Sequence, residues 1–332
     1  MYRGVRKSYM PKTLHQPSGP AAIRSKGLNK PGRGLLFYLY RDRYLYLFLI
    51  PAMSYFFLFK FVTLYGELIA FKDFRLLDGV WGSPWVGLKH FHTLFESADF
   101  WNVLRNTLLL NLYNLVFAFP APILLALLLN ELRVNWFKRA VQNMLYLPFF
   151  ISWVVLAGII VSLLSPSTGV VNAALRLFGI DPVYFMTSTL WWPVVFIVST
   201  IWQSAGWGTI IYMAAISSID PGLYEAAKID GATKLRQIWH ITLPGIRGTI
   251  GVLLVLQMGK MMDVGFEHIF NLQNAAVFSV SDVISTFVYR TGLQNAQYSL
   301  ATAVGLFQAL IGLILVLTVN KIVKKLGEGG LW

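Results

Sequence analysis

The sequence contains no cysteine and few charged residues. Its 332 residues include 0 Cys, and 13% are charged while 56% are hydrophobic. Without cysteine the chain can form neither a disulfide nor a thiolate metal site. So low a charged fraction excludes an ordinary soluble domain, and the long apolar runs are typical of transmembrane helices.

Nucleotide-binding and catalytic motifs are also absent from the sequence. Its Gly-Lys pair, Gly259-Lys260, has no glycine at the required spacing before it and Met261 after it, so it is not a phosphate-binding loop. The five histidines have no metal-ligand spacing, and the apolar runs hold no constellation of catalytic groups. We therefore expect a non-catalytic chain that binds no metal or cofactor.

Six apolar runs are long enough to cross a bilayer. We expect spans at about residues 44–65, 106–129, 141–164, 192–216, from 249 onward, and 298–319. The predicted fold is an all-α integral membrane protein with six transmembrane helices. Residues 1–43 form a basic N-terminal arm, 44–320 the transmembrane domain and 321–332 a tail.

The positive charge follows the predicted topology. The net charge is +13, and 20 of the 28 Lys and Arg residues lie before Tyr44, in the second-to-third loop, around the loop 220–245 or in the tail. This positive-inside bias predicts that both termini are cytoplasmic. It also explains the basic composition without a nucleic-acid partner. No cleavage signal precedes the first span, which we interpret as an uncleaved anchor.

A polar segment, Asp220–Pro244, separates the fourth and fifth apolar runs. Asp220 is a good N-cap, and Pro221 suits the first position of a helix. Asp230-Gly231 is a stop signal, because glycine accepts the left-handed conformation. We expect a second short helix over about Thr233–His240, ended by Pro244 because its ring disfavours helical geometry at the preceding residue.

This segment resembles the EAA loop of ABC importer permeases. The matching residues are Glu225, Ala226, Ala227, Asp230, Gly231, Ala232, Leu243 and Pro244. The resemblance implies a type I importer permease whose coupling helix docks on a separate ATPase subunit, with Glu225 making a polar contact. It also implies that the alanines allow close approach and that Gly231 sets the turn. The alternative role of Glu225 is a helix-terminus charge worth only ~0.3–1 kcal/mol.

Further motifs resemble maltose-type carbohydrate permeases, in the subgroup that imports polysaccharide fragments such as alginate or rhamnogalacturonan oligosaccharides. They are Phe119–Glu131, Gln142, Tyr146–Trp153, Gly206-Trp207 with Tyr212, and Tyr289-Arg290 with Gly292. The resemblance implies a bacterial inner-membrane complex that works by alternating access. Its other members are a second related permease, two ATPase subunits carrying ATP and Mg, and an extracytoplasmic sugar-binding protein.

Polar residues inside the apolar runs are candidates for a translocation pathway, because such groups seldom face lipid. They are Asn111, Asn114, Ser199, Gln203, Trp207, Gln257, Lys260 and Asp263. An amide and an aromatic ring on one helix face, as at Gln203 and Trp207, suit a sugar. The amides could equally hold helices together, and Lys260 could pair with Asp263.

The alternatives to such an importer of oligosaccharides are a secondary transporter, a membrane-embedded enzyme and an ABC importer for another class of solute. A secondary transporter needs intramembrane ion sites and often two similar halves, but charges at membrane depth occur only in the fifth run and no repeat is visible. A membrane-embedded enzyme lacks its catalytic constellation. The remaining alternative to an oligosaccharide importer is an ABC importer for a non-carbohydrate solute.

Overall fold

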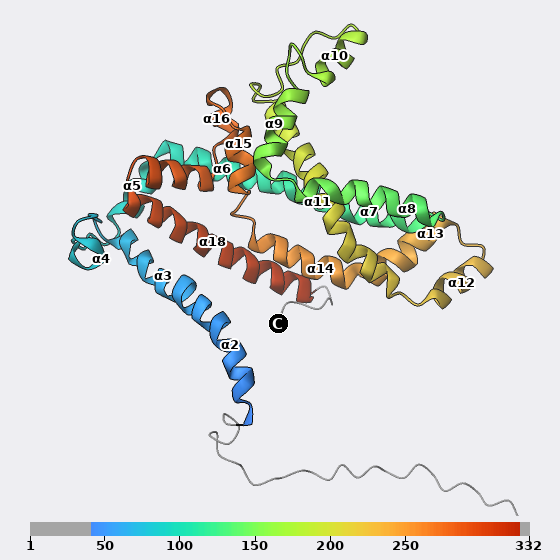
Figure 1. Cartoon of the computed structure of the whole chain (residues 1–332), viewed down its shortest axis with the longest axis horizontal. Coiled ribbons are helices and arrows are strands. Elements are labelled where there is room, and N and C mark those ends of the chain that lie inside the picture. Colours follow the sequence, from blue (N-terminus) through green and yellow to red (C-terminus); the bar gives the residue numbers. More distant parts are fainter. Residues whose placement is uncertain (1–40, 326–332) are drawn as a thin grey trace, which may run out of the picture. The chain divides into compact units, whose positions relative to one another are not determined.

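The computed structural model describes residues 41–325, and every regular element within that range is helical. The one β interaction among them is an isolated bridge between Lys72 and Trp85. The all-α prediction is therefore confirmed for this part of the chain (Figure 1). Most of the predicted basic arm and the end of the tail lie outside the described residues.

The chain divides into two compact units, Met1–Phe61 and Val62–Trp332. The described part of the first unit consists of α2 (Arg43–Phe56) and a π-helical turn, η1 (Phe57–Phe61). Their side chains are exposed although nearly all are apolar. With α3 (Val62–Leu64) and η2 (Tyr65–Phe71), the run Arg43–Phe71 is long and apolar enough to cross a membrane. An all-round apolar surface of this kind suits lipid.

Four further helical runs meet the same length and hydropathy criteria: Ala98–Glu131, Trp191–Ser217, Lys234–Gly259 and Tyr298–Lys325. With Arg43–Phe71 they make five candidate spans among the described residues, and a bent helix pair brings the number to six if it is counted as one span. The second, fourth and sixth predicted spans are thus confirmed as helices, and the second begins eight residues earlier than the prediction of Asn106.

The third predicted span is wrong as a single helix over 141–164. Instead α8 (Asn135–Tyr146) and η4 (Leu147–Phe150) are followed by α9 (Trp153–Leu163), and the two halves are bent by 106°. Pro148 lies in the last turn before the bend, and Ile151 and Ser152 have extended backbone. Extended residues cannot continue a helix, so the apolar run is broken or re-entrant.

Pro244 does not end a helix, contrary to the prediction. A continuous helical run passes through it, formed by α13 (Lys234–Gln237), η5 (Ile238–Thr242) and α14 (Leu243–Gly259). The π-helical turn η5 ends at Thr242, with Leu243 between the turn and the proline, and Leu243 keeps helical angles, φ −62° and ψ −46°. A wider turn relieves the loss of the proline N–H and the clash of its ring. The fifth span therefore begins at Lys234, not near Thr249.

The same arrangement accommodates the prolines of the second span. α6 (Ala98–Tyr113) passes through the π-helical turn η3 (Asn114–Ala118) into α7 (Pro120–Glu131). Pro120 is the first residue of α7, and Phe119 alone separates it from the wide turn. In both spans one residue separates the local widening of the helix from the proline.

Three apolar clusters hold the second unit together. One joins α9 and α11 (Trp191–Ser217) to α15 (Phe266–Leu272), and a second joins α7, α11 and α14. The third joins α5 (Lys89–Glu96) and α6 to α17 (Ile284–Val288) and α18 (Tyr298–Lys325). The remaining short helices are α4 (Gly79–Gly82), α10 (Val170–Leu177), α12 (Pro221–Ile229), η6 (Ala275–Val277), α16 (Phe278–Ser281) and η7 (Tyr289–Gln294). α11 contributes to two of the clusters, so it packs against α9 and α15 as well as against α7 and α14.

Candidate functional site

The predicted coupling segment begins with a capped helix. The Asp220 carboxylate accepts a hydrogen bond from the Gly222 N–H at 2.9 Å, and Pro221 is the first residue of α12. The cap satisfies one of the backbone donors that a helix start leaves free. The predicted start of this helix is confirmed.

Gly231 forms the turn at the end of α12. Its φ is +74°, in the left-handed region that favours glycine. The N–H of Gly231 donates to the Lys228 carbonyl at 3.1 Å, and the N–H of Ala232 donates to the Ala227 carbonyl at 2.8 Å. These two bonds form a Schellman motif around the C-cap residue Asp230. The predicted turn is confirmed, and glycine suits this position because the backbone has a positive φ there.

The outer surface of α12 combines a charge with apolar side chains. Glu225 and Ala226 are exposed, and Ala227 is half-buried. Leu223 is exposed, and Ile229 is 87% exposed. An exposed carboxylate among small and apolar residues is a surface on which another protein can pack closely and form a polar contact.

Two contacts that the sequence did not reveal fix this segment to the spans. The hydroxyls of Tyr224 and Thr242 lie 3.0 Å apart, which joins α12 to η5. Lys234 Nζ lies 2.9 Å from Glu131 Oε2, which joins α13 to the end of α7. Leu243 packs against the apolar cluster of α7, α11 and α14. A displacement of α12 would therefore be transmitted to the ends of two spans.

Half of the eight residues predicted for the translocation pathway line one cavity, and the other four lie elsewhere. A cavity of about 400 Å³ lies between α7, α11 and α14. Its lining includes four predicted pathway residues, Asn114, Trp207, Gln257 and Lys260. The other lining residues are Ala118, Phe119, Pro122, Phe149, Thr200, Ser204, Gly208, Ile211, Tyr212, Leu253 and Leu256. We call this cavity the polar pocket.

Asn111 and Gln203 lie outside the polar pocket. Asn111 is buried, and its Nδ2 donates to the Thr107 carbonyl one turn earlier at 3.1 Å. Gln203 is half-buried on α11 but does not line the cavity. This bond lies within α6, so the role of Asn111 in holding neighbouring helices together stays a prediction.

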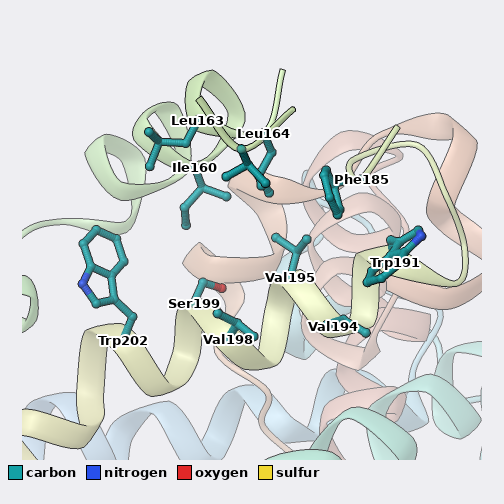
Figure 2. Close-up of a pocket in the computed structure, with 11 residues that line it drawn as sticks. Ile160, Leu163, Leu164, Phe185, Trp191, Val194, Val195, Val198, Ser199 and Trp202 are labelled. Atoms are coloured by element: carbon teal, nitrogen blue, oxygen red, sulfur yellow. The ribbon is translucent and has the colours of Figure 1, made fainter. Parts of the chain in front are cut away.

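Ser199 also lies elsewhere, at an apolar cavity of about 320 Å³ between α9 and α11. Figure 2 shows its hydroxyl among apolar side chains. The Ser199 Oγ donates to the Phe196 carbonyl at 2.9 Å and lies 2.9 Å from His268 Nε2. The His268 ring stacks on Trp153 with centroids 3.5 Å apart. Burial lowers the pKa of His268 to about 3, so this imidazole is neutral and joins α9, α11 and α15.

Lys260 and Asp263 lie just beyond the end of the fifth span, because α14 ends at Gly259. The Asp263 carboxylate accepts a hydrogen bond from the Gly265 N–H at 3.0 Å and lines a separate cavity between α14 and α18. Over residues 41–325, Lys260 and Asp263 form no ion pair with each other. The interpretation of these two residues as a simple pair is wrong.

The polar pocket offers both hydrogen-bonding groups and an aromatic wall. Asn114 is 8% exposed, and its buried Oδ1 has no hydrogen-bond partner among the described residues. The Thr200 and Ser204 hydroxyls donate to carbonyls of their own helix, which leaves their oxygens as acceptors. Trp207 stacks on Phe149 with centroids 4.7 Å apart and stays 42% exposed. Such a combination suits a ligand with hydroxyl groups and C–H faces.

Several pocket residues were missed by the sequence reasoning. Thr200, Ser204, Gly208 and Ile211 follow one helix face at intervals of three and four residues, a spacing that could have been found. Phe149 comes from the turn before the bend of the third span. No local pattern relates it to α11, since their contact depends on how the broken helix packs.

Comparison with known proteins agrees with this architecture. Residues 102–327 match the protein-family model described as "Binding-protein-dependent transport system inner membrane component". The polygalacturonan/rhamnogalacturonan transport system permease protein YteP of Bacillus subtilis (strain 168) is 48% identical over 298 residues, covering 90% of this chain and 93% of the relative. Protein LplB of the same organism is 43% identical, covering 89% of this chain and 92% of LplB.

A solved structure extends the likeness to three dimensions. It is the crystal structure of a bacterial alginate ABC transporter in complex with an alginate pentasaccharide-bound periplasmic protein. One of its chains superposes with a TM-score of 0.83 at 44% sequence identity, covering 90% of this chain and 99% of that one. With a family match over more than half of its length, the chain belongs to the binding-protein-dependent transport system inner membrane components.

Proposed function

We propose that this chain is the transmembrane subunit of an ATP-driven importer of oligosaccharides and contributes half of the translocation pathway. The observation that carries the proposal is the polar pocket, where Asn114, Trp207 and Gln257 meet between candidate spans. The relatives named for polygalacturonan, rhamnogalacturonan and alginate transport support a saccharide substrate. Membership of a binding-protein-dependent family favours this function over an ion-coupled secondary transporter.

The chain acts without catalytic chemistry of its own. A second related permease completes the pathway, and two separate ATPase subunits bind ATP and Mg. An extracytoplasmic binding protein delivers the sugar. ATP-driven closure of the ATPase dimer moves α12, the tethers Tyr224–Thr242 and Lys234–Glu131 transmit the motion to the spans, and the pocket turns outward. Hydrolysis reverses the movement. The exposed surface of α12, with Glu225 on it, supports this docking role.

The proposed topology places both termini and residues 220–245 in the cytoplasm, with residues 165–190 outside. Ile229 and Leu177 are each 87% exposed and lie in these two regions. Because the sequence has no cysteine, single Ile229→Cys and Leu177→Cys variants carry one reactive thiol each. In sealed cells a membrane-impermeant maleimide should label only Leu177→Cys, and lysis should expose Ile229→Cys. Labelling of both in sealed cells would contradict the topology.

Trp207→Ala tests the substrate pathway. The change removes an aromatic surface from the polar pocket while the α12 docking surface stays intact. We expect about tenfold slower oligosaccharide uptake per assembled complex, with ATP hydrolysis retained. The measurement is transport and ATPase rate in liposomes containing all subunits and the binding protein.

Trp202→Ala is the matched control. Trp202 is 44% exposed on the same helix but lines the apolar cavity instead (Figure 2). This variant should transport at nearly the wild-type rate. If Trp207 only packs helices, its removal should cost about 3–5 kcal/mol and reduce recovery of the complex. Reduced recovery with unchanged transport per complex would reject the pathway role.

A further inference from the structure

The polar pocket contains one ionisable group that is charged at neutral pH. Among its lining residues, Lys260 is a cation and none is a carboxylate. The remaining polar groups, Asn114, Thr200, Ser204 and Gln257 among them, are neutral. The pocket lining therefore carries a positive charge and no negative charge. A neutral sugar would not need this charge, because uncharged hydroxyl and amide groups suffice to bind it.

Lys260 is held at the pocket by the end of α14. It is the C-cap residue, and its backbone N–H donates to the Gln257 carbonyl at 3.0 Å. Its side chain is exposed, and over residues 41–325 no carboxylate forms an ion pair with it. Asp263 is the nearest acidic residue in the sequence, but it lines a different cavity and caps the Gly265 N–H. The positive charge is thus available to a ligand.

We propose that Lys260 makes the pocket selective for acidic oligosaccharides, by binding a carboxylate of a uronic acid residue. This inference rests on the proposed function, because it assigns a charge class to the ligand of the same pocket. A carboxylate leaving water for a pocket between apolar spans needs a partner, and a lysine ammonium supplies a charge-assisted hydrogen bond. The unpartnered Asn114 Oδ1 would accept from a sugar hydroxyl in the same cavity.

A different role for Lys260 makes a different prediction. A cation at the C-terminus of a helix interacts favourably with the helix dipole. If that were its whole contribution, neutralising Lys260 would lower stability and would affect acidic and neutral sugars alike. Discrimination between two ligands that differ only in charge therefore separates the two roles.

The experiment uses the purified complex of both permeases and both ATPases, without the binding protein. The probes are trigalacturonate and its fully methyl-esterified form, which has the same sugars without carboxylate charge. The wild-type complex should bind trigalacturonate more tightly, and added salt should reduce the difference. Lys260→Gln should weaken trigalacturonate binding by about tenfold and leave ester binding unchanged. Lys260→Arg should keep most of the preference, since it keeps the charge.

Lys89→Gln, at an exposed lysine of α5 outside the pocket, is the control and should behave as wild type. If wild type binds both probes equally, or if Lys260→Gln weakens both equally, the charge inference is overturned while an oligosaccharide site remains. If the wild-type complex binds neither probe and transports no oligosaccharide, the proposed function itself fails. The two failures are therefore distinguishable.

Discussion

Glu225→Lys is expected to reduce ATP-driven transport to about a tenth of the wild-type rate or less, because it weakens docking of the ATPase. Glu225 is exposed on α12, and the Schellman turn at Gly231 and the tethers to the spans hold that helix in a defined place. Reversing the charge at a close interface replaces attraction by repulsion. Co-purification of the ATPase with the permease, and transport per complex, are the measurements.

The control for this change is Glu96→Lys. Glu96 is an exposed helical glutamate on α5, and its partner His92, at 3.2 Å, is exposed as well. An exposed pair of this kind contributes about 0–1 kcal/mol, so the same substitution there should leave transport unchanged. Normal ATPase recovery and a wild-type transport rate in Glu225→Lys would show that the charge on α12 has no part in coupling.

Gly206→Ala is expected to destabilise the transmembrane domain by about 3 kcal/mol or more. Gly206 lies on α11 where that helix contacts α8, and a Cβ built there would overlap the Leu145 carbonyl oxygen. The obstacle is backbone, so no side-chain rotation can relieve it. The two helices would have to separate, and the neighbouring polar pocket, lined by Phe149 and Trp207, would open. Thermal unfolding of the purified protein in detergent measures the effect.

Gly158→Ala is the matched change in another apolar helix. A Cβ at Gly158 of α9 meets no atom within 4 Å. Because alanine favours helix over glycine, this variant should stay within about 1 kcal/mol of wild type or be slightly more stable. Equal unfolding temperatures for the two variants would contradict a close approach of α8 and α11 at Gly206.

Short-range signals in the sequence were sufficient for much of the coupling segment. Asp220 caps α12 as predicted, and Gly231 has the positive φ that a glycine after a helix indicates. Both features depend on hydrogen bonds between groups only a few residues apart in the chain. The choice of Pro244 as a helix end failed, because the turn Ile238–Thr242 widens into a π-helix and tolerates the ring.

The structure brings only some of the residues predicted for the pathway together in one cavity, because the prediction treated each helix separately. Ser199, Gln203 and Trp207 are evenly spaced on α11, yet only Trp207 reaches the polar pocket. Ser199 instead contacts His268, which is 69 residues away in the sequence. Which part of a helix surface faces a cavity depends on the helices packed around it, and periodicity within one helix does not contain that information.

The sequence by itself determined the all-α membrane class of the fold, the apolar runs and the capped helix that leads into the turn at Gly231. These properties follow from hydropathy and from interactions between near neighbours in the chain. Tertiary structure alone decided that the third span bends by 106° and that Phe149 packs on Trp207. It also decided that Lys260 joins Asn114 in one pocket while Asp263 lies in another. The physical reason is that these contacts join residues of different helices, whose relative positions are set by packing across the whole domain.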